Sequence, residues 1–236
     1  MNNELKILHI IDSLGLGGAQ TVVKGIFEYQ PENKSIFLFV LRQRDITTEI
    51  KHSNVRIFNS TKKYSFKPLF ELRDLVRKEN IDILHCHLLR SQVFGWLLKK
   101  IYFKNIKLIF HEHGQIVGSE SDNIFESIIF IMFIKISKNN VNKFIAISNF
   151  IKDKLVEKGN INETKIIVVY NFVDLNKFNK KNIIWNIKKE REKLRIHDND
   201  YVVGFAGRLI KRKGWREFIN SAKILLQENK NIKFII

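Results

Sequence analysis

The sequence predicts an α/β protein with a doubly wound parallel sheet, followed by the beginning of a second unit built in the same way. Short apolar runs alternate with stretches of helical spacing from residue 5 to residue 172, which is typical of a parallel sheet with crossover helices. The apolar runs show no polar alternation, as expected for strands that are covered on both faces. The alternation stops over residues 173–199 and resumes at residue 200.

The first unit, residues 1–172, contains the predicted sheet. Its strands are "LKILHII" (5–11), "SIFLFVL" (35–41), "VRIFN" (55–59), "IDILHCH" (81–87), "IKLIF" (106–110), "NKFIAIS" (142–148) and "TKIIVVY" (164–170). The predicted helices begin near Ala19 and then span 66–80, 88–102, 124–138 and 149–159. Pro68 fits the first turn of the second of these helices, and Gly159 fits the end of the last.

The second unit is predicted to be short. Residues 173–199 are rich in charge and poor in strand signal, which indicates a linker with a surface helix. The run "YVVGFAG" (201–207), a helix from Gly214 to about Asn229 and the run "IKFII" (232–236) then give one β-α-β motif over 200–236. A motif of this size is too small to bury a core of its own.

Composition limits the classes of protein. Hydrophobic residues make up 44% of the chain, enough for a sizeable core, and the single cysteine, Cys86, excludes a disulfide framework and favours the cytoplasm. No signal peptide is expected, and the run "IIFIMFI" (128–134) is far shorter than the roughly 20 residues of a membrane span. The net charge of +17 leaves two interpretations open, a lysine-rich surface or a peripheral contact with the anionic inner face of a membrane. Nucleic acid is not expected as a partner, because no binding motif accompanies the charge.

A glycine-rich segment, "SLGLGGAQ" (13–20), follows the first strand and opens the first helix. Free backbone N–H groups at such a helix N-terminus favour an anion, and Gly17 and Gly18 let a ligand approach the backbone closely. A dinucleotide site is not expected, because Gln20 stands where the fingerprint has its third glycine and no acidic residue ends the second strand. A glycine turn without a ligand is the alternative.

Two histidine pairs end neighbouring strands. His85 and His87 lie in "LHCH", and His111 and His113 flank Glu112 in "HEH". The carboxyl ends of parallel strands are where α/β sheets bind ligands, and residues i and i+2 of a strand point the same way. A zinc site is the alternative to a polar lining, but the sequence offers no helical H-x-x-x-H and no outlying ligand at a useful spacing. No metal is therefore expected, and His113 is the candidate for chemistry.

A basic turn, "GRLIKRKGW" (207–215), follows the first strand of the second unit. Arg208 offers a planar guanidinium suited to a phosphate, and Lys213 offers a mobile point charge. Both surround one turn at a helix N-terminus, which predicts a phosphate site. A solvated basic loop is the alternative in so lysine-rich a chain.

These stretches together resemble the family 4 retaining glycosyltransferases, which have the GT-B architecture of two Rossmann-like domains. The stretches that carry the resemblance are, in order, "GGAQ", "IDILHCH", "HEHG", "KFIAISNFIKDKLVEKG", "KIIVVYNFVDLNKF" and "VVGFAGRLIKRKGW". It runs from about Leu5 to the last residue. The resemblance implies transfer of a sugar from a nucleotide sugar to a hydroxyl of a saccharide or lipid-linked acceptor, with retained anomeric configuration and without a metal or other cofactor.

The resemblance also assigns roles to residues. It implies that Gly207, Arg208 and Lys213 bind the donor diphosphate, that Gly17 and Gly18 lie near the donor, and that His113 lies near the reacting sugar. At the junction, the family's N-G-V-D pattern is Asn171-Phe172-Val173-Asp174 here. The family's E-x₇-E motif, expected later in the donor domain, does not occur by Ile236.

Three hypotheses remain at the level of sequence. The first is a glycosyltransferase, present here as the acceptor domain with the start of the donor domain and expected to be inactive in this form. The second is a non-catalytic remnant or partner subunit that needs a donor domain in trans. The third is a metal-dependent hydrolase that uses the histidines.

Overall fold

Two compact units make up the chain, Met1–Phe172 and Val173–Ile236. The computed structural model describes residues 4–42, 49–58, 65–114, 116, 124–179, 187–228 and 231–236.

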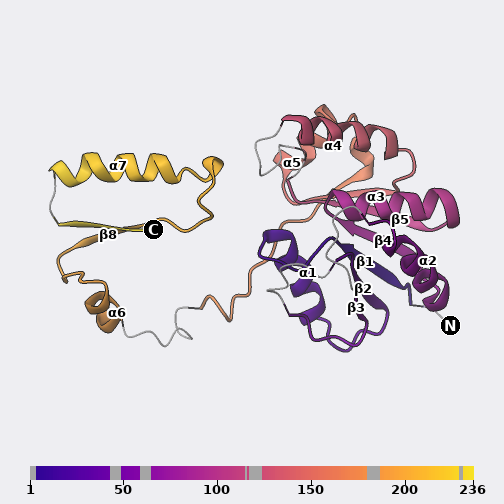
Figure 1. The fold of residues 1–236 in the computed structure, drawn as a ribbon, viewed down its shortest axis with the longest axis horizontal. Coiled ribbons are helices and arrows are strands. Elements are labelled where there is room, and N and C mark those ends of the chain that lie inside the picture. The colour runs from indigo at the N-terminus through magenta and orange to yellow at the C-terminus, as the bar shows by residue number, and fades with distance from the viewer. Residues whose placement is uncertain are drawn as a thin grey trace. The chain divides into compact units, whose positions relative to one another are not determined.

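The first unit is built on a sheet of seven parallel strands (Figure 1). The strands are β1 (Ile7–Ile11), β2 (Ile36–Val40), β3 (Val55–Ile57), β4 (Ile83–His87), β5 (Lys107–Glu112), β6 (Lys143–Ala146) and β7 (Ile166–Val168). Every adjacent pair is parallel. The predicted α/β class and the parallel sheet are confirmed.

The strand order is β3-β2-β1-β4-β5-β6-β7, so the direction of winding reverses between β1 and β4. At such a switch point the loops that follow the two strands leave in opposite directions, and a ligand site forms at the carboxyl ends of the strands. The glycine-rich segment follows β1, and His87 ends β4. The topology therefore places both at the switch point.

Helices α1 (Gly18–Glu28), α2 (Pro68–Glu79), α3 (Leu89–Leu97), α4 (Ile124–Ser137) and α5 (Asn149–Glu157) connect these strands. Local sequence sets their ends. Pro68 opens α2, and Asn80 closes it in the left-handed conformation with φ 53°. The Ser148 hydroxyl accepts a hydrogen bond from the backbone N–H of Ile151 and so caps α5. Helix α3 continues as a π-type turn, Leu98–Tyr102.

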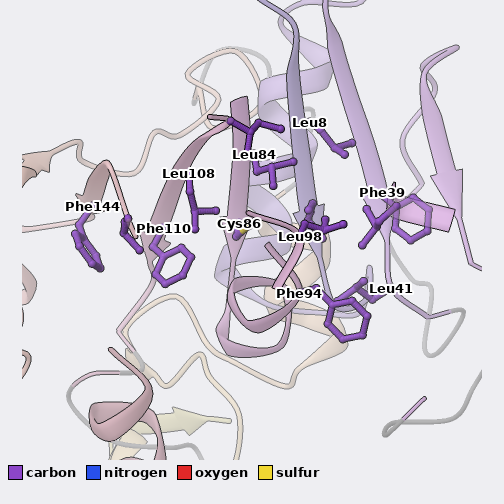
Figure 2. Packing of buried hydrophobic residues seen from close by; sticks show 14 of the residues in the cluster. Leu8, Phe39, Leu41, Leu84, Cys86, Phe94, Leu98, Leu108, Phe110 and Phe144 are labelled. Atoms are coloured by element: carbon purple, nitrogen blue, oxygen red, sulfur yellow. The ribbon is translucent and has the colours of Figure 1, made fainter. Parts of the chain in front are cut away.

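The two faces of the sheet have different cores. One face and the helices α2 to α5 form a large apolar cluster that includes Leu8, Leu84, Cys86, Leu108 and Phe110. Figure 2 shows part of this cluster, including Leu84 and Cys86 of β4, Leu108 and Phe110 of β5 and Phe94 of α3. The opposite face carries a smaller cluster in which the buried helical side chains, among the described residues, come from α1. Strand residues i and i+2 share a face, so the histidines lie on this second face.

The end of the first unit packs on α1. The aromatic ring of Phe172 lies over Gly25, where a β-carbon would overlap the ring. The same ring makes an edge-on contact with Tyr29, with centroids 5.9 Å apart. Phe172 therefore occupies space that any larger residue at position 25 would fill.

The second unit contains β8 (Tyr201–Gly204) and β9 (Ile232–Ile235), which pair in parallel, with α7 (Trp215–Glu228) alongside (Figure 1). A short helix, α6 (Ile187–Lys193), precedes them. All four residues of β8 are exposed. Phe218 of α7 contacts Phe205 and Phe234, beside a hollow of about 250 Å³. The predicted β-α-β motif is present, with an open apolar face.

Candidate functional site

The N-terminus of α1 stands at the switch point with exposed backbone. Gly17 is its N-cap residue, and no side chain of the described residues caps this end; the first turn contains no acidic residue either. A β-carbon at Gly18 would meet nothing within 4 Å. The first N–H groups of a helix carry partial positive charge. This end of α1 can therefore receive an anionic or strongly polar ligand, as the sequence predicts for Gly17 and Gly18.

An acidic residue beside this loop is held by two arginines. Asp12 directly follows β1, and its Oδ1 accepts a hydrogen bond of 2.8 Å from Arg90 Nη1. Its Oδ2 accepts from Arg42 Nε at 2.9 Å and also forms an ion pair with Arg42 Nη2. The three side chains are 11–17% exposed. This pairing holds the chain in place between β1 and the glycine-rich segment (13–20).

The histidines form a continuous group on the three central strands. His9 of β1 is in register with His85 of β4, and His87 of β4 is in register with His111 of β5. His113 follows β5 directly. The side chains of His9, His85, His87 and His111 are at most 9% exposed. Among the described residues, these five histidines make up a group that we call the histidine cluster.

Ring nitrogens within the histidine cluster lie at hydrogen-bond distance from one another. His9 Nδ1 is 3.1 Å from His87 Nε2, and His87 Nδ1 is 3.0 Å from His113 Nε2. His85 Nε2 is 3.2 Å from His111 Nδ1. The rings of His111 and His113 stack, with centroids 4.2 Å apart. His113 thus ends a chain of three contacting imidazoles.

Burial keeps the cluster uncharged. Loss of hydration disfavours the imidazolium ion, and it lowers the pKa of His9 and of His113 to about 3 and that of His111 to about 4. The pKa of His85 and that of His87 lie well below the usual value for the same reason, and the neighbouring imidazoles lower them further. At neutral pH each ring therefore has one N–H donor and one lone pair.

The loop that carries His113 is organised by Glu112. Its Oε1 accepts hydrogen bonds of 3.0 Å from the backbone N–H groups of Gly114 and Ile116. Gly114 has φ 110°, a conformation that residues with a β-carbon rarely adopt. His113 is half-buried at the rim of the cluster, so its ring can face both the other histidines and a ligand.

The predicted phosphate-binding turn lies in the second unit. Lys211–Lys213 form one turn of 3₁₀-helix between β8 and α7, closed by Gly214 with φ 74°. Arg208 and Lys213 are both exposed. A β-carbon at Gly207 would lie 4.0 Å from Cβ of Lys213, so the two ends of the turn come together. The structure thus gathers Gly207 and Lys213 in the second unit, and Gly17, Gly18 and His113 at the carboxyl edge of the first.

Most of the chain matches a known protein family. The sequence profile of Glycosyltransferase Family 4 matches residues 16–177, which include Gly17, Gly18 and the histidines of β4 and β5. The chain belongs to glycosyltransferase family 4. It is an α/β protein with the fold found in GT-B glycosyltransferases. The hydrolase alternative is not favoured by these relatives.

Some relatives are named as glycosyltransferases of capsular polysaccharide or O-antigen biosynthesis. The chain is 24% identical over 236 residues to an Escherichia coli UDP-Gal:alpha-D-GlcNAc-diphosphoundecaprenol alpha-1,3-galactosyltransferase, covering 97% of this chain and 60% of the relative. It is 30% identical over 116 residues to the Staphylococcus aureus capsular polysaccharide biosynthesis glycosyltransferase CapM, covering 48% of this chain and 30% of the relative. A Klebsiella pneumoniae protein of the cps region is 27% identical over 73% of this chain and 44% of its own length. The chain thus spans between about a third and three fifths of these relatives.

A solved structure has the same fold. Anabaena Alr3699/HepE, crystallised in complex with UDP-glucose, matches 98% of this chain and 60% of its own chain with a TM-score of 0.74 and 19% identity. At this identity the likeness shows a shared fold. None of the described helices has the length and apolar character needed to cross a membrane.

Two features of the site escaped prediction from the sequence. His9 lies in an apolar strand and is 78 residues from His87, its contact partner. The sequence shows no outlying ligand at a useful spacing, but the pairing of β1 with β4 brings His9 next to His85 and His87. Asp12, with Arg42 and Arg90, also went unrecognised. The signal available was a charged residue at the end of a buried strand, a position where an unpaired charge is costly.

Proposed function

We propose that the chain contributes to the transfer of a sugar from a nucleotide sugar to a hydroxyl acceptor with retained anomeric configuration. The observation that carries the proposal is the placement of the α1 N-terminus and of His113 at the carboxyl edge of one sheet, in a chain that belongs to family 4. This edge is where a parallel sheet binds its ligands.

The proposed roles follow the chemistry of a leaving diphosphate. Arg208 and Lys213, with Gly207 giving room for close approach, stabilise the negative charge that develops on the diphosphate. Fixed cations of this kind do so without a metal ion, and each contributes about 10²- to 10³-fold to the rate. Gly17 and Gly18 offer backbone N–H groups to the donor. His113, neutral at its low pKa, donates or accepts a hydrogen bond near the reacting sugar.

Activity of the 236 residues by themselves is not expected. In the second unit β8 is exposed on all four residues and the apolar face of α7 borders a hollow. A donor site on so thinly packed a unit would be poorly ordered, since ordering costs conformational entropy that packing must offset. We therefore expect weak nucleotide binding and no turnover. The alternative, a partner subunit that borrows a donor domain in trans, predicts turnover once that domain is added.

The test begins with the natural polypeptide. Its intact mass is compared with the 27.9 kDa of this chain, and it is incubated with labelled nucleotide sugars and a lipid extract as acceptor. We expect label in the acceptor, with a loss of about 10²-fold or more in His113→Ala, Arg208→Ala and Lys213→Ala. Lys188→Ala, which removes an exposed lysine of α6, is the matched control and should leave the rate unchanged. Transfer that survives in Arg208→Ala and Lys213→Ala would refute the proposed donor site.

The acceptor is proposed to be lipid-linked, and the chain to bind peripherally to the cytoplasmic face of a membrane. Helix α4 supports this proposal, because one side packs through Phe130 and Ile134 while a stripe on the other side is 47–74% exposed. The exposed stripe consists of Phe125, Ile128, Ile129, Met132 and Ile136. Its spacing of three and four residues is that of one helix face, and exposed Lys135 and the net charge of +17 suit an anionic lipid surface.

Sedimentation with vesicles tests the membrane contact. Vesicles containing anionic lipid should retain the chain, and Ile129→Ser should release it by removing a side chain that is 56% exposed. Ile101→Ser is the control, because Ile101 is 55% exposed but lies outside α4. Equal release by the two variants would show that the stripe has no special role.

A further inference from the structure

The histidine cluster contains more ring nitrogens than one hydrogen-bonding histidine near a sugar requires. Two sets of three lie close enough to share an ion, with ligand atoms within 4.8 Å of one another: His9, His85 and His87, and His87, His111 and His113. The first set comes from β1 and β4, and the second from β4, β5 and the residue after β5. The two sets share His87, and a neutral imidazole has one free lone pair, so His87 can serve one ion at a time.

We propose that His87, His111 and His113 form a binding site for a divalent transition-metal ion of the zinc type. His9 orients His87, and His85 orients His111, through the contacts between their ring nitrogens. This site shares His113 with the proposed sugar site and has no residue in common with the proposed diphosphate turn, which needs no metal. Ion binding goes beyond the proposed sugar transfer.

The distances fit a tetrahedral ion. Zinc binds imidazole nitrogen at about 2.0–2.1 Å, so two ligands of one tetrahedral ion lie about 3.3 Å apart. His87 Nδ1 and His113 Nε2 are 3.0 Å apart. All ligand atoms of the set lie within 4.8 Å of one another, so modest ring rotations would bring the three nitrogens to one centre. Three imidazoles and one open position are a common coordination set for zinc.

The hydrogen-bond pattern favours this outer set over the inner one. His87 uses Nε2 for its contact with His9, and His111 uses Nδ1 for its contact with His85. Nδ1 of His87 and Nε2 of His111 then face the ion, while the other nitrogen of each ring donates to a second histidine. Ligand histidines are usually held in this way by a second hydrogen bond, which fixes the tautomer. An ion in either set replaces one imidazole contact, that of His9 with His87 in the inner set or that of His87 with His113 in the outer set. Among the described residues, only the outer set also has a buried ring nitrogen without a partner at hand.

Buried nitrogens support the outer set as well. Nε2 of His111 and Nδ1 of His113 are buried and have no hydrogen-bond partner among the described residues. A buried polar atom without a partner is unfavourable, and the bound ion would satisfy Nε2 of His111. Without the ion, Nε2–H of His113 donates to Nδ1 of His87. When the ion binds, this proton moves to Nδ1 of His113, so every ring stays neutral with one N–H group. Half-buried His113 also gives the ion an entry path.

Cobalt(II) is the probe, since a tetrahedral cobalt centre absorbs strongly in the visible. The full chain is titrated with Co²⁺, and Zn²⁺ affinity is then measured by competition with a chromogenic chelator. We expect one ion per chain and a tetrahedral spectrum. His113→Ala, at the rim, and His111→Asn should each weaken binding about 100-fold or more, and His85→Gln about 10- to 100-fold. His197→Ala, an exposed histidine of the second unit, is the control and should bind as the wild type does.

Folding is monitored in the same samples. Zinc should raise the thermal midpoint of the wild type and of His197→Ala but not of His113→Ala, because only a bound ion stabilises the folded state. Absence of saturable binding in the wild type overturns the proposal. So does binding that survives in His113→Ala and is lost in His9→Ala, which would assign the ion to the inner set. Metal affinity is read without any assay of sugar transfer, so failure here leaves the proposed function standing.

Discussion

The two units of this chain place similar strands in different surroundings. In the first unit β4 lies between β1 and β5, and four of its five residues are buried. In the second unit β8 has one strand partner among the described residues, and all four of its residues are exposed. Both strands contain apolar residues, so their sequences alone do not account for the difference. The layers packed around a strand determine its burial. The carboxyl edge of the first unit is therefore the better packed place for a binding site.

The largest effect should come from deleting a core side chain in the packed unit. Phe110→Ala removes a ring that is 0% exposed and should lower the free energy of unfolding by about 3–5 kcal/mol. Phe234→Ala, at a half-buried position of β9, should lower it by about 1 kcal/mol. Urea unfolding measures both, and hydrogen exchange resolves the two units. Equal losses would mean that the second unit is as well packed as the first.

The ion pair at the edge of the packed unit should come next. Asp12→Asn leaves Arg42 and Arg90 without their carboxylate and should cost about 3 kcal/mol. Glu157→Gln, which breaks the surface pair of Lys154 and Glu157, should cost less than about 1 kcal/mol. Chemical denaturation of the two variants provides the comparison. A loss in Asp12→Asn no greater than in Glu157→Gln would show that this network contributes little to order at the edge.

Acid should destabilise the first unit and spare the second. The folded pKa of His9 and of His113 is about 3 and that of His111 about 4, below the value near 6.5 of the unfolded chain. The unfolded state then binds more protons, so stability is full above pH 6.5 and falls as the pH drops toward 4. We expect a loss of more than about 2 kcal/mol between pH 7 and pH 4.5 in metal-free protein. Unfolding midpoints measured across this range would contradict the prediction if they stayed level.

The smallest effect concerns the last residue of the first unit. Gly25→Ala should destabilise by about 1 kcal/mol, because the new methyl group meets the ring of Phe172. In a Phe172→Ala background the same change should instead stabilise by up to about 1 kcal/mol, since alanine is the better helix former. A thermal-unfolding cycle of the four proteins tests this reversal of sign. The same sign in both backgrounds would mean that Phe172 does not rest on α1.

The sequence specifies the elements more fully than their surroundings. Apolar runs predicted every strand of the sheet. Strand β7 is shorter than its apolar run and spans only Ile166–Val168; it lies at the edge of the sheet and, among the described strands, pairs with β6 alone. The histidine pairs were evident at their strand ends. His9 was not, since its role depends on the register of β1 with β4, which is a long-range property. The sequence of the run "IIFIMFI" does not show which of its residues are buried. The run lies in α4, and the structure buries one side of this helix and exposes the other.

The packing of Phe172 on Gly25 determines how the joint after the first unit behaves. A glycine at position 172, as the family's pattern has it, would let the chain rotate freely before it reaches Val173. The phenylalanine ring instead packs on α1. Gly17 and Gly18 lie at the other end of the same helix. The residue that closes the first unit and the glycine-rich segment are therefore held by one helix.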